Sequence, residues 1–157
     1  MHNHHRALGL AAPIGRVAAA TIARQRPVQP VTLIRPHAAR RAARFFVEKF
    51  PGRSLYAVKA NPSPDLLHIL WESGVTHYDV ASIAEVRLIA ETLPAAEQCF
   101  MHPVKAEEAI AEAYFSHGVR TFSLDTIVEL DKIVRATATE GVAAWDLNLL
   151  VRIRVSS

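Results

Sequence analysis

The sequence contains a single cysteine, Cys99, among 157 residues. One cysteine excludes a disulfide-stabilised scaffold and a zinc site built on cysteines, and it suits a reducing cytoplasm. Only six residues are glycine, which excludes a collagen-like repeat. Apolar residues make up 50% of the chain and charged residues 21%. This composition indicates a globular protein with enough apolar material for one domain with its own core.

Long apolar runs are also absent. The stretch from Val17 to Ala23 is far shorter than the ~18 residues that a membrane-spanning helix needs. We therefore expect no membrane association.

No carboxylate occurs before Glu48, whereas residues 1–47 contain eight arginines. The rest of the chain has 10 basic and 15 acidic residues, so charges of +8 and −5 add to the net charge of +3. Basic residues are not clustered with aromatic ones in this second part, which argues against nucleic-acid binding. We divide the chain into a basic, poorly ordered leader (residues 1–30) and a folded part (residues 31–157). The histidines near the start (His2, His4, His5) are expected to be solvated, and no metal site is predicted.

Strand-like and helix-like segments alternate from residue 31 onward. A short β-type run at residues 31–34 is followed by five cycles, each with turn or capping residues at the junctions. Residues 82–85 and 126–129 read as capping boxes, in which Ser82 and Thr126 cap the following helix and a glutamate, Glu85 or Glu129, stands three positions later. Short apolar strands alternating with helices are typical of parallel βαβ units, so the fold class is α/β. The five expected strands lie at residues 54–60, 76–80, 98–102, 120–125 and 147–153, and the helices at residues 37–50, 66–73, 83–93, 106–117 and 127–139.

A charged or titratable residue lies at or near the end of each of these strands. They are Lys59, Asp79, His102, Asp125 and Arg152. In a β/α barrel this end of the strands collects the catalytic groups. A flavodoxin-like open sheet would show the same local pattern, so both architectures remain open at this point.

Lys59 is the strongest candidate for chemistry. Burial among the small and apolar residues of its strand would lower the pKa of the amine, and such a lysine can form an imine. The alternative is a lysine that extends from the strand end to solvent. For Asp125 the simplest role is capping of the next helix, and for His102 it is a structural one. Arg152 in an apolar strand requires an anionic partner, either a carboxylate or a ligand oxygen.

Residues 56–62 read YAVKANP and resemble the lysine motif of fold-type III decarboxylases, which depend on pyridoxal 5′-phosphate (PLP). These are the ornithine, lysine, diaminopimelate and arginine decarboxylases, which share an alanine-racemase-like barrel. Residues 78–82 with Glu85, residues 102–105, residues 122–125 and residues 151–153 resemble the four following units of that barrel in the same order. The resemblance covers residues 31–155 and is closest to bacterial ornithine/lysine decarboxylases.

This resemblance implies that Lys59 forms the internal aldimine with PLP. It places Asp79 beside Lys59, Ala57 in the pocket wall, Glu85 as a support for Asp79, and Arg152 near the cofactor, with His102 as a further pocket residue. The implied reaction is decarboxylation of a small basic amino acid such as ornithine or lysine, in polyamine biosynthesis. PLP supplies the electron sink, and the protein supplies orientation and electrostatics. The family also implies a cytoplasmic homodimer for the full-length protein.

A complete barrel has eight βα units and about 250 residues. We therefore expect a partial (β/α)8 barrel with about five of the eight units, as the N-terminal part of a decarboxylase, and no useful activity of this chain by itself. The alternatives are a diaminopimelate decarboxylase, an amino-acid racemase of the same barrel group, a Schiff-base aldolase without PLP, and a non-catalytic half-barrel that binds a full-length partner.

Overall fold

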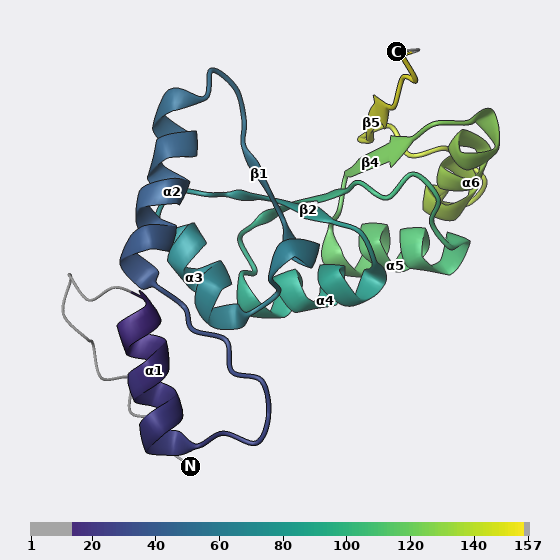
Figure 1. Ribbon diagram of the computed structural model, residues 1–157. Coiled ribbons are helices and arrows are strands. Elements are labelled where there is room, and N and C mark those ends of the chain that lie inside the picture. Colours follow the sequence, from purple (N-terminus) through teal and green to yellow (C-terminus); the bar gives the residue numbers. More distant parts are fainter. Residues whose placement is uncertain (1–13, 156–157) are drawn as a thin grey trace.

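The computed structural model describes residues 14–155, and its central element is a five-stranded parallel sheet (Figure 1). The strands lie in the order β1-β2-β3-β4-β5, so each strand pairs with its neighbour in the sequence. All five strands expected from the sequence are present. Their bounds are Leu55–Ala57 (β1), His77–Val80 (β2), Glu97–Phe100 (β3), Thr121–Leu124 (β4) and Asn148–Val151 (β5).

Helices α3 to α6 connect successive strands and lie together on one face of the sheet (Figure 1). An open flavodoxin-like sheet reverses its strand order and carries helices on both faces, whereas a β/α barrel does neither. The observed order and the one-sided helix layer therefore correspond to a partial β/α barrel with five strands. The helices of this layer are Pro64–Glu72 (α3), Ile83–Thr92 (α4), Glu107–His117 (α5) and Ile127–Thr137 (α6).

The hydrophobic core lies between the sheet and this helix layer. Strand residues Tyr78, Val80 and Phe122 are fully buried, and they pack with buried helix residues such as Ile89 and Ile133. Two of the helices begin at the capping residues expected from the sequence. The hydroxyl oxygens of Ser82 and Thr126 accept hydrogen bonds from the third backbone N–H of α4 and α6, respectively.

Helix α2 (Pro36–Lys49) confirms the helix expected at residues 37–50, and it packs against α3 at one end of the helix layer (Figure 1). The β-type run expected at residues 31–34 is not a strand. These residues link α2 to helix α1 (Ile14–Gln25) and lie outside the sheet, so they have no neighbouring strand with which to pair.

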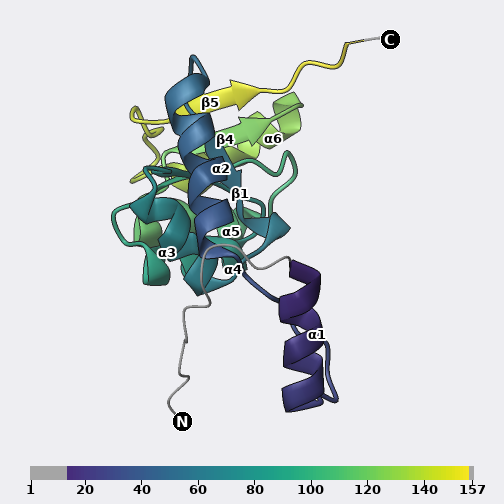
Figure 2. The same cartoon turned by 60° about the vertical axis from the view of Figure 1, so that its left-hand side comes forward.

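Helix α1 falls within the segment expected to be poorly ordered, and it projects away from the rest of the molecule in both views (Figures 1 and 2). The division of the chain at residue 30 stays a prediction. The histidines at positions 2, 4 and 5 lie outside the described residues. In residues 14–155 no helix is long and apolar enough to span a membrane.

Candidate functional site

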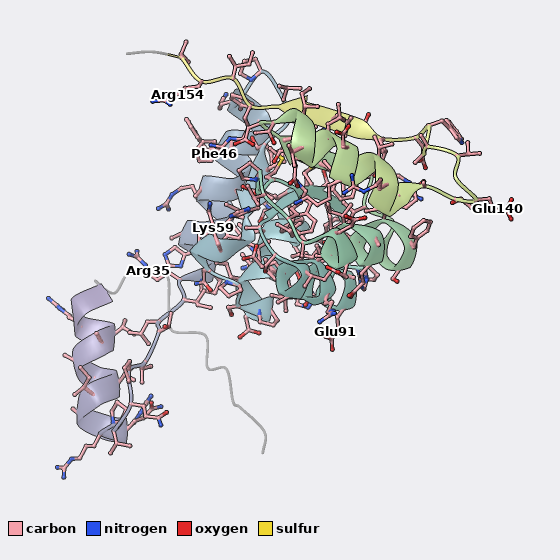
Figure 3. The ribbon with its side chains drawn as sticks, turned by 90° about the vertical axis from the view of Figure 1, so that its right-hand side faces the viewer. Arg35, Phe46, Lys59, Glu91, Glu140 and Arg154 are labelled. Carbon is pink, nitrogen blue, oxygen red and sulfur yellow. The ribbon has the colours of Figure 1, made fainter. Side chains whose placement is uncertain are left out.

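The carboxyl ends of the five strands meet along one rim of the sheet. In Figure 3, Lys59 lies at this end of the molecule and Glu140, in the loop before β5, lies at the opposite end. Along the strands, Ala57, Asp79, Cys99 and Thr121 are aligned by the pairing register. Their neighbours in each strand point into the core, so this row lies on the face of the sheet that the helices leave uncovered. We call it the open face.

Lys59 lies directly after β1, in a short 3-10 turn formed by Val58–Ala60. The sequence leaves two alternatives for Lys59, a buried amine and a side chain that extends from the strand end to solvent. The structure has the second, because the side chain is exposed. The strand ends at Ala57, and the turn buries Val58 while directing Lys59 outward. Within residues 14–155 the Lys59 amine makes no ion pair or hydrogen bond. It is therefore accessible from solvent and is not held by another described side chain.

Asp79 is the titratable group of the open face that interacts with Lys59. Asp79 is partly buried on β2, in register with Ala57 on one side and Cys99 on the other. Burial raises the pKa of Asp79 above its ordinary value, and the positive charge of Lys59 opposes part of this rise. Burial also raises the pKa of Cys99. The expected grouping of Ala57, Lys59 and Asp79 is thus present at one end of the rim.

In the part of the chain that the structure describes, Glu85 forms no hydrogen bond or ion pair with Lys59 or Asp79. Its carboxylate oxygen Oε2 accepts a hydrogen bond of 2.8 Å from the backbone N–H of Ala81, and its own N–H donates to Ser82 Oγ at 3.3 Å. The bond to Ser82 is the helix cap that the sequence predicts, and the carboxylate reaches one residue further back than in a standard capping box, to Ala81. Glu85 consequently holds the loop that follows β2 instead of the side chain of Asp79.

His102 and Arg152 are both exposed at the rim. The imidazole Nδ1 of His102 lies 2.6 Å from the carbonyl oxygen and 3.2 Å from the backbone nitrogen of Val104, so it is engaged in its own loop. The backbone N–H of Arg152 continues the pairing of β5 with a bond to Leu124 O, but in the described part of the chain its guanidinium has no carboxylate partner. The sequence places Arg152 inside an apolar strand, where it requires an anionic partner, but β5 ends at Val151 and Arg152 is exposed, so solvent can hydrate its charge.

Asp125, the remaining strand-end residue, is exposed and does not cap α6, because Thr126 takes that role. A cluster of charged residues that the sequence does not predict lies at this part of the rim. Lys105, Glu129 and Lys132 form two ion pairs of 2.9 Å and 2.7 Å. The sequence predicts only a capping role for Glu129. The i, i+3 spacing of Glu129 and Lys132 is the one sequence signal for an ion pair, and it does not indicate Lys105.

An exposed amine just after a barrel strand, a nearby carboxyl whose pKa is raised by burial, and an exposed arginine without a carboxylate partner in residues 14–155 suit an aldehyde cofactor that carries an anionic group. Residues 37–157 match the family model described as "Pyridoxal-dependent decarboxylase, pyridoxal binding domain". The chain belongs to this decarboxylase family.

Relatives of known name agree with this assignment. A lysine/ornithine decarboxylase of Selenomonas ruminantium is 35% identical over 101 residues, which cover 64% of this chain and 23% of the relative. Antizyme inhibitor 2 of Rattus norvegicus is 38% identical over 85 residues, which cover 54% of this chain and 18% of the relative. The crystal structure of a lysine/ornithine decarboxylase from Vibrio vulnificus, complexed with cadaverine, superimposes with a TM-score of 0.72 and 27% identity over 89% of this chain and 36% of that one. The chain thus spans about a quarter of the first curated relative's length.

Proposed function

We propose that this decarboxylase-family domain binds PLP through Lys59 and belongs to an enzyme that decarboxylates lysine or ornithine. The observation that carries the proposal is the exposed Lys59 amine, unpaired within residues 14–155, on the rim beside Asp79. An amine in this position can condense with an aldehyde, forming a C=N bond and releasing water. Bound PLP supplies an electron sink for the loss of carbon dioxide.

The other rim residues have more limited roles in this proposal. Ala57 is small and leaves space beside Lys59 on the open face, and Asp79 places a negative charge or a proton near the amine. Arg152 supplies a cation for an anionic group of the cofactor or substrate. Glu85 acts on the site through the loop after β2, and His102 lies on the β3 side of the rim.

A small basic substrate is supported by the relatives, one of which has been crystallised with cadaverine, a diamine. A homodimeric, cytoplasmic parent protein belongs to the same proposal. We also retain the expectation that the 157-residue chain releases no carbon dioxide by itself, because residues 14–155 supply five of the eight strands of a barrel.

The direct test is borohydride reduction of the chain in the presence of PLP, followed by peptide mapping. The chain has four lysines: Lys49, Lys59, Lys105 and Lys132. Lys105 is buried and Lys132 is paired with Glu129, whereas Lys49 is exposed on α2 and serves as the matched control. We expect the label on Lys59, its loss in Lys59→Ala and no change in Lys49→Ala. Equal labelling of Lys49 and Lys59 would contradict the proposal.

A second candidate function is non-catalytic binding to a full-length relative. It is favoured by the 38% identity to antizyme inhibitor 2, whose name describes a regulator. Size-exclusion chromatography of the chain mixed with a full-length lysine/ornithine decarboxylase separates the two functions. A mixed complex without PLP labelling of Lys59 supports the binding function, and labelling without a complex supports the enzymatic one.

A further inference from the structure

The pairing between β3 and β4 is short compared with that of its neighbours. Its register consists of Cys99↔Thr121 and Phe100↔Phe122, whereas β4 pairs with β5 from Thr121 to Leu124. On the other side, Met101 N–H still donates to Val80 O of β2. The backbone ladder between β3 and β4 therefore ends before the rim.

Side-chain donors connect the two strand ends beyond this point. The hydroxyl of Ser123 donates to Met101 O at 2.6 Å. The ammonium of Lys105 donates to His102 O at 2.9 Å and to Ser123 O at 2.6 Å. A lysine from the loop after β3 thus bridges two carbonyl oxygens, one following β3 and one on β4.

Glu129 and Lys132, from the first turns of α6, complete this arrangement. Glu129 Oε1 lies 2.9 Å from Lys105 Nζ and accepts the backbone N–H of Lys105 at 3.1 Å. Glu129 Oε2 lies 2.7 Å from Lys132 Nζ, which also donates to Lys105 O at 2.5 Å. We call Lys105, Glu129 and Lys132 the rim cluster.

The burial of the rim cluster makes these contacts specific. The side chains of Lys105 and Glu129 are 1% and 4% exposed, respectively. An ammonium has three N–H donors, and those of Lys105 have three acceptors: two carbonyl oxygens and the carboxylate. A buried charge that lost one of these partners would be strongly disfavoured, so the geometry is held tightly.

We propose that the rim cluster consists of positioning residues, which fix the loop carrying His102 against the end of β4 and so set the shape of the β3–β4 part of the rim. Its importance for cofactor or substrate binding rests on the function proposed above. The rim cluster does not react itself, because the amine of Lys105 is saturated with hydrogen bonds.

The test compares Lys105→Met and Lys132→Met with Arg135→Met. Arg135 lies on α6, as Lys132 does. It forms an exposed ion pair with Glu107 of α5 and is the matched control. The imidazole resonance of His102, assigned by its loss in His102→Asn, is measured by NMR together with hydrogen exchange of the residue-105 amide. In folded Lys105→Met we expect the resonance to move and the amide to exchange about tenfold faster. Lys132→Met should cause a smaller shift in the same direction, and Arg135→Met none.

A role in stability alone would lower the melting temperature and leave His102 unchanged in the folded protein. An unmoved His102 resonance in Lys105→Met would therefore overturn the proposal. If Lys105→Met does not fold, Lys132→Met decides, because the Lys105–Glu129 pair remains in it. PLP labelling of Lys59 in the unsubstituted chain is measured in parallel. If PLP does not label Lys59, the proposed function is contradicted, but the result for His102 still tests the role of the rim cluster.

Discussion

The two faces of the sheet differ in how their side chains are held. On the helix-covered face, Tyr78, Phe100 and Phe122 are at most 2% exposed and pack into one continuous core. On the open face, Cys99 is buried, Asp79 is only partly buried, and the rim residues Lys59 and Arg152 are exposed. The first face provides the stability of the domain, and the second carries the groups proposed to act on a ligand.

Two carboxyl groups, Glu112 on the helix layer and Asp79 on the open face, also differ in their pKa values. Glu112, on the outer surface of the helix layer, is held by a two-bond contact with Arg87 and by His117, and this lowers its pKa to about 2. On the open face, burial raises the pKa of Asp79. Because folding lowers the pKa of Glu112, its ionised carboxylate stabilises the folded state. Because folding raises the pKa of Asp79, ionisation of Asp79 destabilises the folded state. Raised pKa values at clefts and rims are typical of functional sites.

The largest expected effect is on the helix-covered face. Phe122 is fully buried, and its ring centroid lies 6.2 Å from that of Phe100. Phe122→Ala should lower the free energy of unfolding by about 3–5 kcal/mol, because it leaves a cavity in the core. Leu150→Ala is the control on the open face, where the 44% exposed side chain should cost roughly 1 kcal/mol or less. Urea unfolding measures the free energy of unfolding of both variants. Equal decreases in the two variants would contradict the contrast between the faces.

Much of the helix-covered face could be predicted from the sequence, because apolar periodicity and capping residues are local signals. Which residues of α2 are buried was harder to predict from the sequence. Phe45 and Phe46 in α2 and Phe50 directly after it have helical spacing, but all three are more than 50% exposed and Ala43 is buried instead. Helix α2 packs against α3 at the end of the layer, so a small residue fits the close contact and the large ones remain outside.

The open face was harder to predict, because it depends on where each strand ends. The sequence contained no signal for the 3-10 turn that exposes Lys59. The Ser82 and Thr126 caps were predicted correctly, yet the two glutamates of the capping motifs differ in their contacts. Glu85 bonds to the backbone, whereas the carboxylate of Glu129 binds two lysines from the loop after β3 and from α6. Lys132 is a local partner of Glu129 in α6, whereas Lys105 and Glu129 come together only through the parallel arrangement of β3 and β4.

A second prediction concerns the pH dependence of the helix layer. The folded-state pKa of Glu112 lies below the ordinary value of 4.5, so its stabilising contribution is present above about pH 4.5 and is lost as the pH falls toward 2. Glu112→Gln should therefore lower the melting temperature at pH 7, and the difference from the unsubstituted chain should shrink toward pH 2. Glu108→Gln, an exposed glutamate of the same helix, is the control. A difference that stays constant between pH 7 and pH 2 would argue against this pairing.

The smallest effect on stability is expected for Asp79→Asn, and its sign is the informative part. Since the folded-state pKa of Asp79 is above the ordinary value of 3.8, protonation favours folding at low pH and this contribution is lost as the pH rises through the folded pKa. At pH 7 the ionised carboxylate is a cost that asparagine removes. Asp79→Asn should then melt at the same temperature as the unsubstituted chain or higher, and this advantage should disappear near pH 3.

In the same variant we expect weaker PLP labelling of Lys59, because the carboxyl group beside the amine is missing. Asp131→Asn, on the exposed surface of α6, should change neither the labelling nor its pH dependence. If Asp79→Asn raises the melting temperature and weakens labelling of Lys59, then Asp79 serves the chemistry of the open face at a cost in stability. A clear loss of stability in Asp79→Asn at pH 7, with labelling unchanged, would instead make Asp79 a structural residue and leave Lys59 without its proposed neighbour.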